Sequence, residues 1–381
     1  MNSSSPHFLK KKPFPWEIKK IEANRDLSQL SLMIDYVKDT NLFSFILPYA
    51  KSTGWWLPSH GSAYEDCGKV MAKGCDNVEK HPSEKAFVRY SKVNCRRKQC
   101  PICFEGWASF EAERSLVRLA SFVKGGKEVH DLIKRVKGET KGLQPRFLHK
   151  RLVEELEEIL KEGSRNRGHP WKPNTPYHVV LSPPTDSGFD KKSYPKLRSK
   201  GYEIARKSGL LGGEPIFHPY RLHCKVCDIA IPDYHESCPK CGGALFQWVK
   251  SPHFHVIGFG WVHGTKQLYE KSGWVVKNLK DRNSVFATLQ YVLSHAGVFV
   301  DPDPKRYDER KFHVVTWFGA LSYNKLVSPK IGHVYSFCPY CGAPLFPIFF
   351  VGGLDQPPPD FDEEHPEKNE FLDDKERWFR A

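Results

Sequence analysis

Apolar residues follow two periodicities along the chain, and together these predict short strands and several helices. The run Tyr177–Pro184 is almost continuously apolar and ends in two prolines, which indicates a buried strand. Apolar and polar residues alternate through residues 251–256, which predicts a strand leading out of Phe246–Lys250. A further short strand is expected at Ala86–Tyr90.

Helical spacing is expected over Leu27–Val37, Gly106–Val123, Pro145–Glu162, Lys191–Ser208 and Asn283–His295. The third of these helices carries leucines four residues apart, and such a stripe indicates a face packed in the core. The last opens on a good N-cap and stops before Gly297. This order of strands and helices predicts an α+β fold, with helices packed on one face of an antiparallel sheet.

Composition and charge narrow the class of protein. The chain has 381 residues, enough for two or three domains, and 40% hydrophobic content favours a folded protein. Its net charge of +14 favours a polyanionic partner such as nucleic acid. Residues 355–381 are acidic, and we interpret them as a solubilising tail in preference to a mobile DNA mimic. No apolar run could span a bilayer and no signal peptide is apparent, so we expect a cytoplasmic protein without a membrane partner.

The eleven cysteines include four Cys-x-x-Cys pairs, far more than chance placement gives. In a reducing cytosol such pairs indicate zinc knuckles rather than disulfides. The middle two pairs, ten residues apart, predict a zinc ribbon with the ligands Cys224, Cys227, Cys238 and Cys241. Four thiolates leave no open coordination position, so this zinc is expected to be structural.

Two further cysteine groups are less complete. Cys338-Pro-Tyr-Cys341-Gly echoes Cys238-Pro-Lys-Cys241-Gly, but no second pair lies nearby. Its other ligands stay open, with His333 as one candidate and a knuckle that has lost its metal as the alternative. An N-terminal zinc site is predicted from Cys75, Cys95, Cys100 and Cys103, with Cys67 or His81 as replacements.

The triplet His253-Phe254-His255 lies in the predicted strand at 251–256. Residues two apart in a strand share a face, so both imidazoles point the same way. Two neutral imidazoles in this arrangement can bind a divalent metal that polarises a phosphodiester. The alternative is a pair of packed strand histidines, and the triplet alone does not decide between them.

Three segments in this order resemble the HUH endonucleases, specifically the rolling-circle replication initiators of archaeal plasmids and viruses. His178–Pro184 looks like motif I of this family, Pro252–Val256 matches its His-hydrophobic-His motif II, and Tyr291–His295 looks like the tyrosine helix of motif III. Cys100–Trp107 is similar to archaeal members that carry N-terminal zinc modules. The resemblance covers roughly residues 65–345.

The resemblance implies an HUH nuclease core with helices on one face and a metal-dependent nicking reaction. His253 and His255 would hold Mg²⁺ or Mn²⁺, and Tyr291 would attack the phosphorus of single-stranded or hairpin origin DNA. The products would be a 5′-phosphotyrosine and a free 3′-OH, with later strand rejoining. The third metal ligand stays open between His178 and a carboxylate. A host polymerase and helicase are the implied protein partners.

Composition and motifs along the chain divide it into domains. These are a basic arm (1–54), a Cys-rich zinc-binding and helical module (55–170), the endonuclease domain (171–335) with the ribbon inserted at 220–247, a Cys knuckle (336–354) and the acidic tail (355–381).

The chain departs from the family at two positions. Ser294 stands where many members have lysine, and Ala287 stands where some relatives have a second tyrosine or a glutamate. His295 or Lys277 could replace the missing cation. If Tyr291 is a core residue, Tyr323 or Tyr307 is the next candidate nucleophile.

Two other functions fit the same residues. An HUH transposase would use the same chemistry on transposon ends, and a non-catalytic zinc-ribbon DNA-binding protein would need no nucleophile. In each case we expect Lys191–Lys207 and Arg96-Arg97-Lys98 to contact phosphates. The tryptophans Trp55, Trp56, Trp261 and Trp274 are candidates to stack on unpaired bases.

Overall fold

The computed structural model describes residues 53–59, 61, 63, 66–140, 145–165, 175–190, 192–231, 237–279, 284–299, 313–331, 337–350 and 370–380. The fold is α+β with antiparallel sheets. It divides into two compact units, one containing Arg221–Val249 and the other containing Tyr49–Tyr220 and Lys250–Ala381. The helix predicted at Leu27–Val37 lies outside the described residues.

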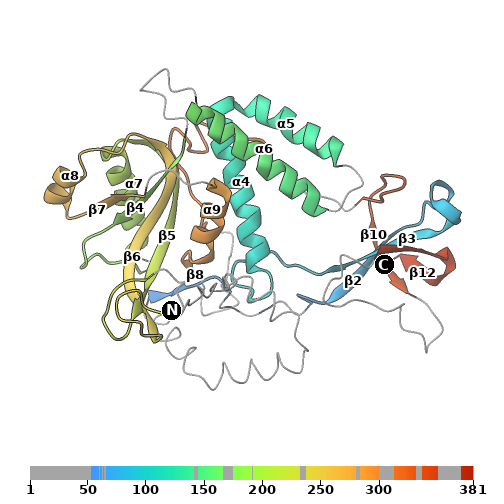
Figure 1. The fold of residues 1–381 in the computed structure, drawn as a ribbon, viewed down its shortest axis with the longest axis horizontal. Coiled ribbons are helices and arrows are strands. Elements are labelled where there is room, and N and C mark those ends of the chain that lie inside the picture. The colour runs from blue at the N-terminus through green and yellow to red at the C-terminus, as the bar shows by residue number, and fades with distance from the viewer. Residues whose placement is uncertain are drawn as a thin grey trace, which may run out of the picture. The chain divides into compact units, whose positions relative to one another are not determined.

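The central sheet has five strands in the order β7-β4-β6-β5-β9 (Figure 1). Their bounds are Val275–Asn278 (β7), Tyr177–Ser182 (β4), Phe246–Gly260 (β6), Leu210–Cys224 (β5) and Phe318–Gly319 (β9). The register pairs Val180 of β4 with His255 of β6 on one side and with Lys277 of β7 on the other. Because directly paired residues share a face, this row runs across three strands on one side of the sheet.

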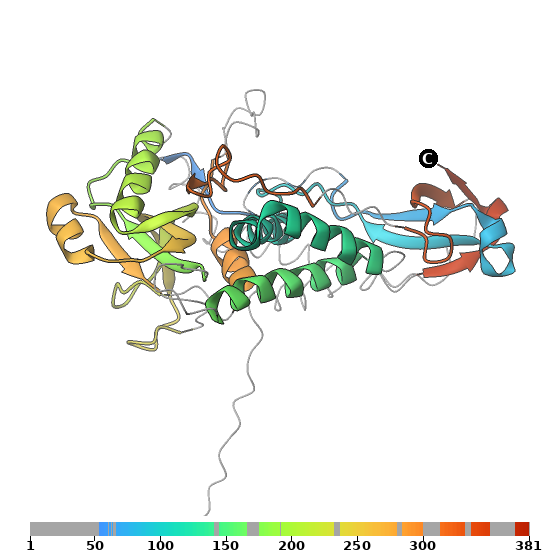
Figure 2. The ribbon, with the colours of Figure 1, turned by 90° about the horizontal axis from the view of Figure 1, so that it is seen from above.

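Four helices share one apolar core with the sheet face that carries Ile216, Ile257 and Phe259. They are α4 (Phe104–Lys124), α5 (Gly126–Glu139), α6 (Pro145–Arg165) and α9 (Val285–Ser294). Figure 2 shows α5 and α6 side by side next to α4. The predicted leucine stripe of α6 is confirmed as core, since Leu152 and Leu156 are fully buried.

The opposite face of the sheet is also covered. Helix α7 (Tyr194–Lys207) packs there, with the backbone of Gly201 close to the ring of Phe254 and the ring of Tyr194 5.0 Å from that of Phe217. The expectation that helices lie on one face is therefore corrected: α7 covers one side and α4 and α9 the other (Figure 1). The reason is that Phe254 and Phe217 give the second face its own apolar surface, which α7 buries.

A second five-stranded sheet has the order β11-β3-β2-β10-β12. Its strands are Glu370–Asp373 (β11), Ala86–Lys92 (β3), Val70–Cys75 (β2), Phe346–Phe350 (β10) and Trp378–Arg380 (β12). The outer strands come from the segment that the sequence assigns to an acidic tail, and the structure places residues 370–380 in this sheet. The sheet therefore joins segments from both ends of the described chain.

Short elements complete the described fold. Strands β1 (Trp55–Trp56) and β8 (Val298–Phe299) pair, and helix α8 (Thr265–Ser272) precedes β7. Three single turns of 3₁₀ helix are η1 (Val78–Lys80), η2 (Pro82–Glu84) and η5 (Lys375–Arg377). Within the described ranges, no helix has both the length and the apolar character of a membrane span.

Candidate active site and metal clusters

Three histidines converge on one face of the central sheet. His253 and His255 lie on β6 and His218 lies on β5. Their ring centroids are 4.4 to 5.2 Å apart, and one nitrogen from each ring lies within 4.8 Å of the others. His218 and His253 are buried and His255 is half-buried. The expectation that His253 and His255 share a face with metal-binding geometry is consistent with this placement.

Each of these rings has an outer hydrogen-bond partner that fixes its orientation. Nδ1 of His253 donates to the carbonyl of Ser251 at 2.7 Å, and Nε2 of His218 donates to the carbonyl of Val292 at 2.8 Å. Nδ1 of His255 lies 2.7 Å from Nε2 of His178. With these nitrogens as donors, the opposite nitrogen of each ring is the one that can bind an ion, as in metal sites with ordered outer partners.

The donor set fits a divalent metal ion. Burial lowers the pKa of His218 well below its ordinary value, and the neighbouring His253 and His295 act in the same direction. His218 is therefore neutral at physiological pH, which is the form that binds a metal. Three imidazoles leave coordination positions for water or substrate, in contrast to a closed site of four thiolates.

His218 is the member of this group that the sequence did not predict. The open choice of third ligand was His178 or a carboxylate, and the structure places His178 behind His255 rather than in the ligand group. No carboxylate belongs to this group among the described residues. The strand β5 was not predicted because it contains Pro215 and Pro219, and prolines argue against a strand. A signal was present: β5 and β6 flank the ribbon, and a hairpin across it brings His218 level with His253.

Helix α9 places Tyr291 beside the histidines. The Tyr291 side chain is 40% exposed, and its ring centroid lies 5.1 Å from that of His295. The ring of His295 is in turn 6.3 Å from that of His218. Val292, whose carbonyl accepts the hydrogen bond from His218, directly follows Tyr291. The tyrosine helix is thus tied to the histidine group through its own backbone.

The start of α9 is fixed by two side chains. Ser284 is the N-cap, and its Oγ accepts a hydrogen bond from the backbone N of Ala287 at 3.0 Å. Glu157 of α6 accepts from the backbone N of Phe286 at 2.7 Å and from Ser284 Oγ at 3.0 Å. These bonds satisfy amides that a helix otherwise leaves open at its N-terminus. These hydrogen bonds therefore fix the first turn of the helix that was predicted at 283–295.

The other candidates around the tyrosine are placed as follows. His295 contacts the ring of Tyr291, whereas Lys277 lies on the same sheet face as His255, two strands away. Tyr323 is exposed and lies under the guanidinium of Arg118, 4.6 Å from ring centroid to Cζ. Tyr307 lies outside the described residues. Of the two proposed cations, His295 is therefore the one in contact with Tyr291.

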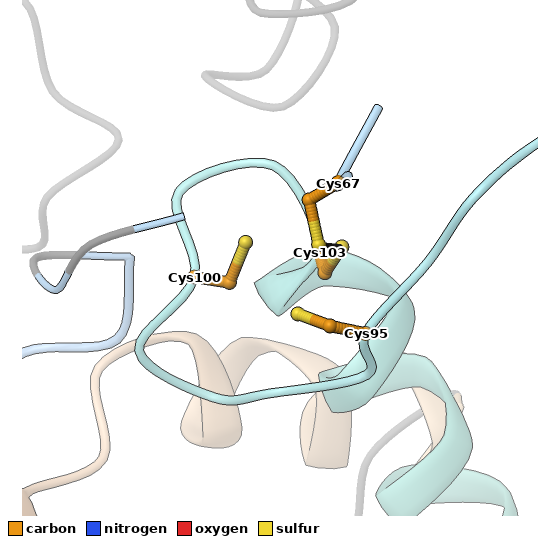
Figure 3. Close-up of side chains that lie close together, drawn as sticks. All are labelled: Cys67, Cys95, Cys100 and Cys103. Atoms are coloured by element: carbon orange, nitrogen blue, oxygen red, sulfur yellow. Dashed lines mark hydrogen bonds between the residues drawn. The ribbon is translucent and has the colours of Figure 1, made fainter. Parts of the chain in front are cut away.

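The N-terminal cysteine cluster contains Cys67, Cys95, Cys100 and Cys103, whose sulfur atoms point toward one another (Figure 3). The predicted group of Cys75, Cys95, Cys100 and Cys103 is corrected, because Cys67 takes the place of Cys75. The antiparallel register explains the exchange. It pairs Val70 with Lys92 and Cys75 with Phe87, so the residues before β2 meet those after β3. Cys67 thereby reaches Cys95, while Cys75 lies at the far end of the hairpin.

The ribbon cluster contains the four predicted cysteines. Sγ of Cys224 lies 3.5 Å from Sγ of Cys241, and Sγ of Cys227 lies 3.5 Å from Sγ of Cys238. Gly242 has φ +71°, and its N donates to the carbonyl of Cys238 at 2.8 Å. This positive φ is the conformation that makes glycine the fitting residue at the turn.

A third cluster contains Cys75, His81, Cys338 and Cys341. It supplies partners for the knuckle whose other ligands the sequence left open. The other candidate, His333, lies outside the described residues. Several clusters in this chain could therefore hold structural zinc.

In each cluster the pKa of one thiol is lowered from its ordinary value. Burial raises the pKa of these thiols, but hydrogen bonds from neighbouring thiols and backbone amides outweigh it. The resulting pKa is about 7 for Cys67, about 6 for Cys238 and about 6 for Cys341. Burial raises the pKa of other thiols in these clusters, and for Cys75 and Cys227 it reaches about 12. A metal ion that binds there would displace the protons of these thiols.

Comparison with family models, with curated proteins and with solved structures gives no match. The geometry of the described residues is therefore what bears on function.

Basic residues line a groove between α7 and α8. It has a volume of about 550 Å³, and its lining includes Lys200, Lys207 and Lys271. Arg96 of the other predicted basic segment is exposed and lies over the ring of Phe110. Both segments are thus available for contacts with an anionic partner, although Lys200 and Lys207 also pair with Glu203.

The tryptophans proposed for base stacking separate into two groups. Trp55 and Trp274 are buried, and Nε1 of Trp55 donates to the carbonyl of Phe189, so these two belong to the core. Trp56 is half-buried. Trp261 is 68% exposed at the end of β6 and is the one that offers a free ring face.

Proposed function

We propose that this protein is a metal-dependent DNA endonuclease of the HUH type, which nicks single-stranded DNA through Tyr291 and initiates rolling-circle replication. The observation that carries the proposal is the group His218, His253 and His255, bonded through His218 to the backbone of the tyrosine helix. Packed strand histidines would not need three rings with converging nitrogens and separate outer partners.

The HUH core is part of this proposal. Support comes from the strand order β7-β4-β6-β5-β9, in which the two-histidine strand β6 is central. The motif I strand β4 pairs directly with it, and the tyrosine helix α9 covers the face on which the histidines lie. The zinc ribbon occupies the connection between β5 and β6, so it can be inserted without breaking the sheet order.

The three imidazoles would hold Mg²⁺ or Mn²⁺, and such an ion polarises a phosphodiester oxygen when bound. Tyr291 Oη attacks the phosphorus, and the bond from phosphorus to the 3′-oxygen breaks. The products are a 5′-phosphotyrosine and a 3′-OH, which takes up a proton. A tyrosine hydroxyl has an ordinary pKa of about 10, so it needs help to lose its proton. In this proposal His295, whose ring contacts the tyrosine ring, accepts that proton.

The substrate is proposed to be single-stranded or hairpin DNA. The net charge of +14 favours a polyanion, and the lysine-lined groove between α7 and α8 offers a path for phosphates. Trp261 provides an exposed ring for stacking on a base. Binding through such groups is expected to weaken steeply as salt concentration rises.

Trapping the covalent intermediate tests the proposal. The full chain would be incubated with a randomised single-stranded DNA pool and Mn²⁺, and the products separated on a denaturing gel. We expect an SDS-resistant adduct that is lost in Tyr291→Phe and in His255→Ala. Tyr323→Phe is the matched control, because Tyr323 is also exposed but lies under Arg118.

Each outcome is informative. An adduct that survives Tyr291→Phe and disappears in Tyr323→Phe would move the nucleophile and contradict the assignment. No adduct with any pool, including hairpin DNA, together with salt-sensitive DNA binding, would favour a non-catalytic zinc-dependent DNA-binding protein. Sequencing the trapped DNA distinguishes a replication origin, where one hairpin sequence is cut, from transposon ends.

A further inference from the structure

The cluster Cys75, His81, Cys338 and Cys341 joins two segments that are far apart in the chain. Cys75 ends β2 and His81 follows η1, whereas the two other cysteines form the knuckle before β10. Sγ of Cys75 lies 3.5 Å from Sγ of Cys341, and Nε2 of His81 lies 3.2 Å from Sγ of Cys338. Neither segment alone holds more than two of the four donors.

The cysteine count supports a metal at this cluster. All eleven cysteines are described, and each belongs to one of the three cysteine clusters. Two clusters have four cysteines and the third has three, so His81 supplies the donor that completes a third set of four. Zinc takes both Cys₄ and Cys₃His sets in structural sites. The odd number of cysteines therefore has a direct explanation.

The knuckle has the same backbone turn as the ribbon. Gly342 has φ +69°, its N donates to the carbonyl of Cys338 at 2.9 Å, and the N of Cys338 donates to the carbonyl of Ala343 at 2.8 Å. The corresponding glycine of the ribbon, Gly242, has φ +71°. The turn that presents two thiolates in the ribbon is thus reproduced here.

His81 is oriented for ligation. Its Nδ1 donates to the carbonyl of Lys85 at 2.8 Å, which leaves Nε2 facing the sulfur of Cys338. An outer hydrogen bond of this kind fixes the tautomer of a ligating histidine. His81, Cys75 and Cys338 are all buried, so the donors are shielded from water.

We propose that these four residues bind Zn²⁺ and that the ion fastens the C-terminal strands onto the β2–β3 hairpin. The apolar cluster around them is small, comprising Cys75, Phe87 and Cys338 with Cys341, Ala343, Leu345 and Leu372. The same sheet has a second small cluster around Val88, Tyr90 and Trp378. Two cores of this size leave room for a further constraint to stabilise a five-stranded sheet. Metal binding supplies it, because the binding free energy of a structural zinc is also folding free energy. This clasp does not depend on the proposed nuclease activity.

Zinc content of the full chain tests the site. The measurement uses a His255→Ala background, so that the histidine group does not add a metal. We expect three zinc ions per chain, one for each cysteine cluster, and two in Cys341→Ser. Cys241→Ser is the matched control, since it removes the equivalent knuckle cysteine of the ribbon and should also leave two.

Hydrogen exchange separates the two variants. In Cys341→Ser, the amides of β10 should exchange at least about 10-fold faster than in the parent chain, because their pairing with β2 is no longer held. In Cys241→Ser, exchange in β10 should be unchanged. Equal protection of β10 in both variants would overturn the clasp, and three zinc ions in Cys341→Ser would overturn the site.

His81→Cys provides a test that does not depend on loss of folding. Because it replaces an imidazole with a thiolate, this variant should still bind three zinc ions and keep β10 protected. With Co²⁺ in place of zinc, its thiolate-to-metal absorption should increase relative to the parent chain. An unchanged cobalt spectrum would show that residue 81 is not a ligand, whereas His130→Ala, an exposed histidine on α5, should behave as the parent.

Discussion

The three-histidine group and the zinc ribbon offer two kinds of metal site on consecutive parts of one chain. The ribbon presents four thiol groups from two tight turns, which leaves a bound ion no free position. The histidine group has three donors, and one of them, His218, is linked through the ring of His295 to an exposed tyrosine. Hydrogen bonds to backbone carbonyls and to another histidine orient its rings. In the ribbon, by contrast, the tight turns themselves position the cysteines. The number of donors and the source of their rigidity thus separate a site suited to chemistry from one suited to structure.

The largest expected effect is the loss of the third histidine. His218→Ala should reduce covalent adduct formation by at least about 100-fold, because an ion held by two ligands lacks a defined geometry. Zinc bound to the cysteine clusters should be unchanged. Adduct yield and zinc content measured on the same preparation check both expectations. Full activity in His218→Ala would show that His218 is not part of the active site.

The next effect concerns the outer partner of His255. His178→Leu removes the acceptor for Nδ1 of His255 and should weaken Mn²⁺ affinity by about 10–100-fold. A Mn²⁺ titration of adduct formation measures this, and high Mn²⁺ should restore most of the yield. The Mn²⁺ affinity of His178→Gln, which retains an acceptor, should lie between that of His178→Leu and that of the parent chain. A loss that Mn²⁺ cannot restore would mean that His178 does more than orient its neighbour.

Removing the ribbon zinc should have a smaller effect on chemistry. Cys241→Ser should lower adduct formation by no more than about 3-fold at saturating Mn²⁺, because the ribbon belongs to a separate compact unit and opens locally. The same gel assay measures it. Complete loss of the adduct would show that the ribbon supports the histidine site and would end the distinction between the two sites.

The smallest effect concerns Glu214, which lies on β5 with His218 and is likewise kept neutral by burial. Burial raises the pKa of Glu214 to about 8, although Ser115 donates to it and Arg114 and Arg118 act in the opposite direction. Between pH 4.5 and about 8 the unfolded chain loses this proton first, so stability falls as pH rises. Glu214→Gln should remove the contribution of this carboxyl to the slope, at most about 1.4 kcal/mol per pH unit, in thermal unfolding followed over this range.

The cysteine clusters show what could be predicted from the sequence. All four ribbon ligands lie within one short segment, so their spacing alone identifies the site. The knuckle at Cys338 has the same local pattern, but its partners are placed by the pairing of β10 with β2. The spacing of cysteines in the sequence does not reveal that these two strands pair. The exchange of Cys75 for Cys67 has the same origin, since it follows from the register of the β2–β3 hairpin.

The histidine site shows a similar limit. Local signals predicted two of the three histidines in the group and the candidate nucleophile. These signals are the alternation around His253 and His255 and the cap of the tyrosine helix. His218 depends on a strand interrupted by two prolines, and its role depends on which face that strand presents. Helices on both faces of the sheet were also missed, because the apolar side of β6 at Phe254 requires a cover that periodicity alone does not place.

The distribution of the cysteines has a consequence for handling and for physiology. Since all eleven lie in the three clusters, the chain has no spare thiol that could be oxidised without cost. An oxidant that joins any two of them removes donors from a cluster, and an ion bound there is released. With zinc in these sites, a zinc-responsive dye would report oxidative damage to this protein before any loss of secondary structure.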